Sequence, residues 1–451
     1  MAEQVDVVVI GLGVGGEEAA GRLAEAGLNV VGLDPRLVGG ECPYWGCIPS
    51  KMMIRAANLI AETRRVNGMA GTATVQPDWA PVAKRIRDEA TDDWNDQVAV
   101  DRLVKKGVTF SRERGTITGP GRVRAGDREF EASRGIIVAT GTVPVIPPIE
   151  GLAGTPYWTN HEAIEADTLP ASIVVLGGGS IGIELTQVFA RFGVDVTVVE
   201  AADRILALEE PESGELAQRA LEREGVEFRT GVKATKIQHS GGFTITLDDG
   251  SEAKGEKLLV ATGRRVDMKS LGLDQVGIDP DARAIEVDEH VRAAAGVWAI
   301  GDVTGKGAFT HTAMYQANVA VFDILGAEGA PVASYHAMPR VTFTDPEIGV
   351  VGQTEKEARE AGLDVKIGIT QVPASARGWI HKSGNDGFIK LVVDNERGVL
   401  VGATSAGPAG GEVLSALAIA VHAAVPVHSL QQMIYAYPTF HRAIGDALKA
   451  L

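Results

Sequence analysis

The pattern of apolar and polar positions near the start of the chain predicts a strand, a tight turn and a helix. An apolar run over residues 6–10 leads into the glycine cluster 11–16, and an alanine-rich stretch over 17–26 has the periodicity of an amphipathic helix. A second apolar run ends at Asp34. This order of elements predicts the first half of a dinucleotide-binding α/β domain.

The same order of elements occurs a second time. A strand, a glycine cluster, a helix and a strand are predicted at residues 172–176, 177–182, 183–192 and 195–199. Each copy is later closed by an apolar strand that ends in Ala-Thr-Gly, at residues 136–141 and 258–263. The chain is therefore expected to contain two dinucleotide-binding domains.

A third pattern begins near Ser334. Strands are predicted at 341–344, 388–393 and 399–403, and helices at 411–424 and 441–450. The predicted fold class is α/β, with two Rossmann-like dinucleotide-binding domains and a C-terminal α+β domain. The expected division is a first domain over 1–150, a second over 151–265, a return to the first over 266–333, and the C-terminal domain over 334–451.

Composition excludes several classes of function. The net charge of −16, without a lysine- or arginine-rich run, argues against nucleic acid as a partner. No signal peptide and no apolar stretch of about 18 residues is found, so we expect a cytoplasmic protein without membrane insertion. The two cysteines are too few for a disulfide scaffold, and their close spacing favours redox chemistry. No metal site is predicted, because zinc would need two more ligands near them.

Both glycine clusters have the spacing Gly-x-Gly-x-x-Gly. The glycines are Gly11, Gly13, Gly16, Gly177, Gly179 and Gly182. Glycine at these positions lets the backbone approach a pyrophosphate, whose charge the following helix N-terminus stabilises. Asp34 and Glu200, at the ends of the next strands, would accept hydrogen bonds from ribose hydroxyls. Because the whole context is repeated, two ordinary tight turns are the less favoured interpretation.

Glu200 also bears on the choice of nicotinamide cofactor. A carboxylate at this place accepts from a free 2′-hydroxyl and repels a 2′-phosphate, which favours NADH over NADPH. Arg204 could weaken that preference, although a solvated loop charge is its simpler interpretation. The use of NADPH therefore stays open.

The two cysteines lie in the segment Gly-Gly-Glu-Cys-Pro-Tyr-Trp-Gly-Cys-Ile-Pro-Ser-Lys over residues 39–51. In a straight helix, residues five apart have Cα atoms roughly 8–9 Å apart, whereas a disulfide tolerates about 7 Å. A bridge between Cys42 and Cys47 therefore requires a distorted helix start, for which Pro43 and Gly46 are suited. A position near a helix N-terminus would favour the thiolate of the second cysteine.

These motifs together resemble the pyridine nucleotide–disulfide oxidoreductases, the flavoprotein family of lipoamide dehydrogenase, glutathione reductase and mercuric reductase. The resemblance covers essentially the whole chain. It rests on both glycine fingerprints, the two Ala-Thr-Gly sites, Gly301-Asp302, and the segments 40–51 and 339–347. It implies a flavoprotein enzyme with bound FAD, NAD(H) and a redox-active disulfide.

The resemblance assigns a role to each matched residue. Residues implied for FAD are Gly11, Gly13, Gly16, Asp34, Gly40, Lys51, Gly115, Thr140, Gly141, Gly301, Asp302 and Thr310. Residues implied for NAD(H) are Gly177, Gly179, Gly182, Glu200 and Gly263. Cys47 would be the flavin-proximal thiol and Cys42 the thiol that meets the substrate. Lys51 would lie near the flavin and pair with Glu184, an assignment favoured over two surface charges because both residues lie in matched motifs.

The C-terminal domain resembles the family's dimerisation domain, which implies a homodimer whose second subunit completes the active site. One departure stands out there. Where the family has a histidine and a glutamate as an acid–base dyad, this chain has Tyr437 and Arg442. A phenol with a pKa near 10 is a poor base at neutral pH, so lipoamide turnover is doubtful. Whether Tyr437 or His441 replaces the missing histidine stays open.

The leading hypothesis is an NADH-dependent flavoprotein that passes electrons through FAD and the cysteine pair to a small-molecule acceptor. One alternative is an NADH:quinone or metal-ion reductase. The C-terminal cysteine pair typical of mercuric reductases is missing, since no cysteine follows Cys47. Another alternative is a low-turnover FAD-binding subunit or redox sensor, against which the intact Lys51, Glu184 and cysteines argue. The acceptor and membership of a larger complex stay open.

Overall fold

The structure, a computed structural model, describes residues 2–451 and falls into two compact units. The first unit comprises the residues up to Pro49, Lys84–Val145 and Arg264–Ser334. The second unit comprises Ser50–Ala83, Ile146–Gly263 and Tyr335–Leu451. The finer division into four segments stays a prediction.

The first unit is built on a mostly parallel sheet of order β16-β17-β6-β1-β2-β3, to which the hairpin β4–β5 adds beside β6. The strands are β1 (Glu3–Ile10), β2 (Val30–Leu33), β3 (Thr109–Ser111), β4 (Gly115–Gly119), β5 (Arg122–Ala125), β6 (Arg128–Val138), β16 (Arg292–Ala294) and β17 (Val297–Ala299). The last four residues of β1 are fully buried. A continuous apolar run of this kind is expected of a parallel strand that is covered on both faces.

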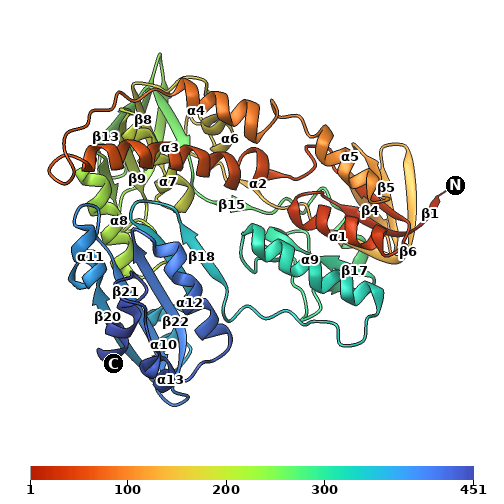
Figure 1. Cartoon of the computed structure of the whole chain (residues 1–451). Helices are drawn as coiled ribbons and strands as arrows, with labels where there is room; N and C mark the ends of the chain where they lie inside the picture. The colour runs from red at the N-terminus through yellow and green to blue at the C-terminus, as the bar shows by residue number, and fades with distance from the viewer. Residues whose placement is uncertain (1) are drawn as a thin grey trace. The chain divides into compact units, whose positions relative to one another are not determined.

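Helices cover one face of this sheet. They are α1 (Val14–Glu25), α5 (Gln97–Lys105) and α9 (Thr310–Leu325), and α1 packs directly on α9 (Figure 1). The other face packs against β4, β5 and the loop segment that holds Met268 and Leu271. A short ribbon of β7 (Val143–Pro144) and β15 (Arg264–Arg265) lies where the chain leaves and re-enters the unit.

The second unit contains a parallel sheet of order β10-β9-β8-β14 and a three-stranded antiparallel sheet. The parallel strands are β8 (Ser172–Leu176), β9 (Asp195–Glu200), β10 (Glu227–Thr230) and β14 (Lys257–Val260). The antiparallel strands are β11 (Ala234–His239), β12 (Phe243–Leu247) and β13 (Glu252–Gly255). The helices of this part are α6 (Asn160–Glu165), α7 (Ser180–Arg191) and α8 (Pro211–Arg223). Helices α3 (Cys47–Arg65) and α4 (Ala80–Arg85) each begin in one unit and end in the other.

The C-terminal part of the second unit is a five-stranded antiparallel sheet of order β18-β19-β22-β21-β20. The strands are β18 (Pro339–Thr342), β19 (Glu347–Gly352), β20 (Val365–Gln371), β21 (Phe388–Asp394) and β22 (Val399–Gly407). The helices are α10 (Glu355–Glu360), α11 (Ala376–His381), α12 (Gly410–His422), α13 (Val427–Gln432) and α14 (Ala443–Lys449). Helix α12 packs on β22 (Figure 1) and on β19, and α14 packs on β20.

A buried ion cluster lies beneath this sheet. The side chain of Lys390, on β21, is 4% exposed and lies 3.0 Å from Glu210, 2.9 Å from Glu212 and 3.0 Å from Glu355. Burial alone would lower the pKa of Lys390, but the hydrogen bonds to the three carboxylates outweigh burial and raise it. The lysine is therefore charged at every physiological pH.

The predicted fold class is confirmed, and the helix starts differ in an instructive way. The helices expected over 17–26 and 183–192 begin three residues earlier, at Val14 and Ser180. The last glycine of each fingerprint therefore lies in the first turn of the helix. There it packs closely against the backbone that follows the preceding strand. The helix expected over 441–450 begins at Ala443, so His441 precedes it.

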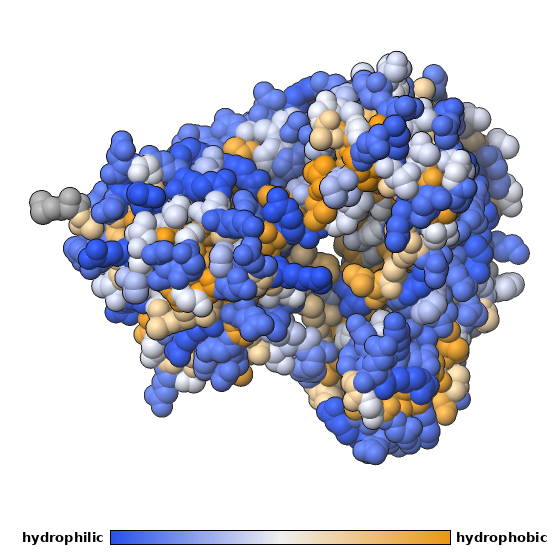
Figure 2. Space-filling model, turned by 180° about the vertical axis from the view of Figure 1, so that it is seen from behind, coloured by the Kyte–Doolittle hydropathy of each residue, from blue (hydrophilic) through white to orange (hydrophobic). Residues whose placement is uncertain are grey.

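Within residues 2–451 no helix is long and apolar enough to cross a membrane. The face shown in Figure 2 is largely hydrophilic, with apolar side chains in scattered groups.

Candidate active site

The first glycine loop connects β1 to α1. Gly11 has φ +93°, and a Cβ there would collide with the carbonyl of Ala139. A Cβ on Gly16 would collide with the carbonyl oxygen of Gly11. Gly13 directly precedes α1, and a Cβ there would meet nothing within 4 Å. The loop is therefore tightly packed at its two ends and open at its centre, where a pyrophosphate can approach the helix N-terminus.

The second glycine loop repeats this arrangement between β8 and α7. Gly177 has φ +110° and no room for a Cβ beside Ala261, and Gly182 packs on the carbonyl of Gly177. Gly179 directly precedes α7 and is open. In both loops the first and third glycines have no room for a side chain, whereas the second glycine has room. This shared arrangement supports two dinucleotide sites of the same design.

The acidic residues after the two loops are oriented in the same way. Asp34 accepts a hydrogen bond from the N–H of Leu12 at 2.7 Å and another from the N–H of Arg36 at 2.8 Å. Glu200 accepts hydrogen bonds from the two corresponding donors. They are the N–H of Gly178, within its loop, and the N–H of Ala202, two residues after Glu200. Each carboxylate oxygen can accept a second hydrogen bond, so both are prepared for ribose hydroxyls.

Polar groups in the first unit fit an FAD that lies along the loop. The hydroxyl of Thr140 is buried without a hydrogen-bond partner among the described residues, as expected of a group that faces a bound cofactor. Asp302 accepts at 2.7 Å from the hydroxyl of Thr142, which itself accepts at 2.8 Å from Nε of Arg264. Arg264 also lies 3.5 Å from Glu41. Thr142 and Arg264 carry no signal in the sequence, because their contacts join segments distant in the chain.

The remaining predicted cofactor residues lie in turns and at element ends. Gly40, Gly141, Gly263 and Gly301 have positive φ, Gly115 begins β4, and Thr310 begins α9. All predicted FAD residues except Lys51 belong to the first unit, together with both cysteines. The second unit holds Lys51, Glu184, Tyr437 and the residues predicted for NAD(H).

The cysteine segment forms two helices rather than one. Cys42 lies in the short helix α2 (Glu41–Tyr44), and Cys47 is the first residue of α3. Trp45 and Gly46 separate them, and a Cβ on Gly46 would lie 3.0 Å from the carbonyl oxygen of Glu41. The distortion that the cysteine spacing requires is therefore present, as a break between two helices.

The electrostatics of the two sulfur atoms differ. The pKa of the Cys42 thiol is raised, first by its hydrogen bond with Cys47 and then by burial. Sγ of Cys47 lies 3.4 Å from the hydroxyl of Thr310, at the N-terminus of α9. Cys47 itself begins α3, and helix N-termini favour negative charge. The geometry thus favours a protonated Cys42 beside a thiolate at Cys47.

Lys51 and Glu184 meet in the second unit. Nζ of Lys51 lies 2.7 Å from Oε2 of Glu184, whose side chain is 8% exposed. The other oxygen of Glu184 accepts from the N–H of Phe343 at 2.8 Å, and Lys51 lies 4.5 Å from the centre of the Phe343 ring. The predicted pairing of the two residues is therefore present, and it holds the ammonium in one place.

The C-terminal segment carries the departure from the family pattern. Tyr437 is 70% exposed, and the guanidinium of Arg442 lies 5.5 Å from the centre of its ring. The ring of His441 is tilted against Tyr435 at 6.3 Å, not against Tyr437. His441 is thus neither on a helix with Tyr437 nor stacked on it.

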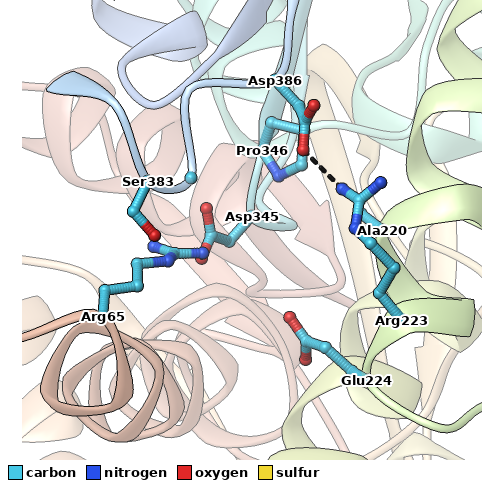
Figure 3. A pocket seen from close by; sticks show the side chains of 9 residues that line it. Arg65, Ala220, Arg223, Glu224, Asp345, Pro346, Ser383 and Asp386 are labelled. Atoms are coloured by element: carbon cyan, nitrogen blue, oxygen red, sulfur yellow. Dashed lines mark hydrogen bonds and ion pairs between the residues drawn. The ribbon is translucent and has the colours of Figure 1, made fainter. Parts of the chain in front are cut away.

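A separate cavity of about 200 Å³ in the second unit contains none of the predicted site residues. Figure 3 shows it between Arg65, Ser383 and Asp345 on one side and Arg223, Asp386 and Glu224 on the other. Its arginines are paired, Arg65 with Asp345 and Arg223 with Asp386. The cavity is therefore a structural junction lined by satisfied charges.

Two dinucleotide-binding loops and a close dithiol define the class of protein as an oxidoreductase that links a nicotinamide cofactor to a disulfide. The chain belongs to the pyridine nucleotide-disulphide oxidoreductases: residues 5–317 match that family, and residues 338–448 match its dimerisation domain. The family predicted from the motifs is thereby confirmed.

Similar proteins agree with this assignment. A dihydrolipoyl dehydrogenase of Halobacterium salinarum is 34% identical over 98% of this chain and 95% of its own length. A mercuric reductase of Shigella flexneri is 32% identical over 96% of this chain and 78% of its own length. Among solved structures, LpdA from Mycobacterium tuberculosis matches with a TM-score of 0.86 and 26% identity over 99% of both chains. A Cu(II) complex of the HOCl-induced flavoprotein disulfide reductase RclA from Escherichia coli matches with a TM-score of 0.85 and 26% identity, over 98% of this chain and 99% of that chain.

The chain is therefore an NAD(P)H-dependent flavoprotein disulfide oxidoreductase of the lipoamide dehydrogenase and mercuric reductase kind, and it binds FAD and NAD(H).

Proposed function

We propose that the enzyme passes electrons from NADH through FAD and the Cys42–Cys47 pair to a small-molecule acceptor that needs no histidine acid, such as a quinone or a redox dye. The observation that carries the proposal is the pair Tyr437 and Arg442 at the place of the family's acid–base dyad. In the net reaction, NADH, a proton and a quinone give NAD⁺ and a hydroquinone.

The proposed roles follow from the described contacts. The first glycine loop, Asp34 and Asp302 hold FAD, and the second loop and Glu200 hold NADH. Bound FAD supplies the two-electron relay between hydride and disulfide. Cys47 would be the thiolate beside the flavin, and Cys42, whose pKa is raised, would keep its proton until the acceptor is reduced.

Lys51 supports this chemistry through its charge. A cation stabilises the negative charge that develops when a neighbouring ring system is reduced. Glu184 fixes Lys51 at 2.7 Å and limits its motion, so we propose Glu184 as a positioning residue.

The proposal includes a homodimer and a cytoplasmic location. Residues 338–448 match the family's dimerisation domain, and apolar side chains of that domain are exposed in the single chain. Ile434 is 95% exposed and Ile419 66% exposed. Contact with a second subunit would remove such apolar side chains from water. In the dimer, Tyr437 would complete the site of the partner subunit.

The test compares acceptors at saturating NADH. Lipoamide reduction should be slow, because general acid–base catalysis is typically worth about 10²–10⁴ in rate and the dyad is missing. Quinone or dye reduction should be faster. The double variant Tyr437→His, Arg442→Glu should gain lipoamide turnover. Wild-type lipoamide turnover that exceeded quinone turnover would refute the proposal.

Reduction of a metal ion is the second candidate. It is favoured by the mercuric reductase relative and by the Cu(II) complex of the similar RclA structure. An Hg(II) and a Cu(II) arm in the same acceptor comparison separate this candidate from quinone reduction.

A further inference from the structure

The segment from Tyr437 to Arg442 carries two stacked pairs of a cation and an aromatic ring. Arg442 lies over the ring of Tyr437 at 5.5 Å, and Arg377, on α11, lies over the ring of Phe440 at 5.4 Å. The ring of His381 meets Phe440 edge-on at 5.5 Å. The stacks fix both guanidinium groups against the segment that contains the proposed active-site tyrosine.

Neither guanidinium is neutralised. Among residues 2–451, the side chains of Arg377 and Arg442 form no ion pair and no hydrogen bond, and each guanidinium lies over an aromatic ring. Each guanidinium carries five N–H donors in a planar fork that suits a carboxylate, sulfonate or phosphate. Elsewhere in the second unit, half-buried or buried arginines such as Arg191 and Arg340 bind carboxylates. The segment and α11 therefore each present one unmatched cation in a chain of net charge −16.

The tyrosine adds a flat apolar surface. In the single chain Tyr437 is 70% exposed and Arg442 lies over one face of its ring, which leaves the opposite face for a ligand. An aromatic ligand can stack there, in an offset or edge-on arrangement that adds to the burial of its area. A ring for stacking and a guanidinium for an anion lie side by side on one short segment.

We infer that the electron acceptor is a planar aromatic molecule that carries an anionic group, with Tyr437 stacking on its ring and Arg442 binding its charge. The inference rests on the proposed function, because it names the class of acceptor for the same site. It assigns Arg442 a role in recognition in place of the carboxylate that the family uses for proton transfer.

The test uses a redox-inert pair of ligands on the FAD-loaded enzyme. Naphthalene-2-sulfonate and 2-naphthol share a ring system and differ in charge, and calorimetry gives the dissociation constant of each. The sulfonate should bind more tightly than the naphthol, and high salt should weaken only the sulfonate. Arg442→Gln should weaken sulfonate binding about tenfold, the loss expected for one charge-assisted hydrogen bond. The naphthol should be unaffected.

Arg219→Gln is the matched control. Arg219 lies on α8, is 60% exposed and pairs with Glu215, so its replacement removes the same charge at an ordinary surface site. It should change sulfonate binding by less than about twofold, because an exposed charge contributes little. Equal affinity for the two ligands, an unaffected Arg442→Gln variant, or an equal loss in the control would overturn the inference.

A turnover arm separates this inference from the proposed function. The ratio of kcat/KM for 1,4-naphthoquinone-2-sulfonate to that for 1,4-naphthoquinone should fall in Arg442→Gln. If the sulfonate ligand binds as expected but no quinone is reduced, the proposed function fails and the binding site stands. If both quinones are reduced and the Arg442→Gln variant leaves their ratio unchanged, the inference fails and the proposed function stands.

Discussion

Replacing Thr310 with valine should raise the pH at which the Cys47 thiolate forms. The hydroxyl of Thr310 lies 3.4 Å from Sγ of Cys47 and also hydrogen-bonds to Cys42, where it acts to lower the pKa. A hydrogen bond to a charged group contributes about 1.5–3 kcal/mol. Because Cys47 is exposed, solvent screening leaves roughly half of this. At 1.36 kcal/mol per pKa unit, the expected rise is about 0.5–1 unit.

The assay is the long-wavelength charge-transfer absorbance expected when a thiolate lies against the flavin. The anaerobically reduced enzyme is titrated with base, and the midpoint of the absorbance rise is compared between variants. A donor to the thiolate favours the charged form, so its removal must shift the midpoint upward. Thr310→Ser retains the hydroxyl and serves as the control. An unchanged midpoint in the valine variant, or an equal shift in the serine variant, would show that the hydroxyl does not stabilise the thiolate.

Four further outcomes are expected. Cys42→Ser should keep the charge-transfer band and Cys47→Ser should abolish it, and equal spectra of the two variants would refute their roles. If Glu200 selects the cofactor, kcat/KM for NADH exceeds that for NADPH, and the reverse order contradicts it. Lys390→Met should cost about 3–5 kcal/mol, because it leaves the buried carboxylate of Glu210 without its cation; denaturant unfolding measures the loss, and equal stability of the variant and the wild type would exclude this cause. Gly15→Ala should lower stability by about 1–3 kcal/mol through overpacking, and an unchanged unfolding midpoint would contradict it.

The sequence was sufficient for the fold class because its strongest signals are local. A strand, a Gly-x-Gly-x-x-Gly turn and a helix are adjacent in the chain, and the backbone constraints at Gly11 and Gly177 permit few other residues. The cysteine spacing likewise predicted a distorted helix start, because a straight helix separates the two Cα atoms too far for a disulfide.

Contacts between distant segments could not be predicted in the same way. Thr142, Arg264 and Asp302 form one hydrogen-bonded chain, although Thr142 lies more than a hundred residues from each of the other two. The stack of Arg377 on Phe440 depends on how α11 packs against the C-terminal segment, which no periodicity encodes. Tyr437 and Arg442 were identified only as a departure from a family pattern, and their mutual stacking became visible in the structure.

One of the differences between the two glycine loops connects the fold to the chemistry. Gly15 in the first loop corresponds to Ile181 in the second, which is 41% exposed. A Cβ on Gly15 would lie 3.0 Å from the carbonyl oxygen of Ala313, in the first turn of α9. Glycine is therefore needed in the first loop only, because α9 packs there. The same helix begins with Thr310, beside Cys47. Because Gly15 has no side chain, the loop that is proposed to hold FAD can pack closely on α9, the helix that contacts the thiolate.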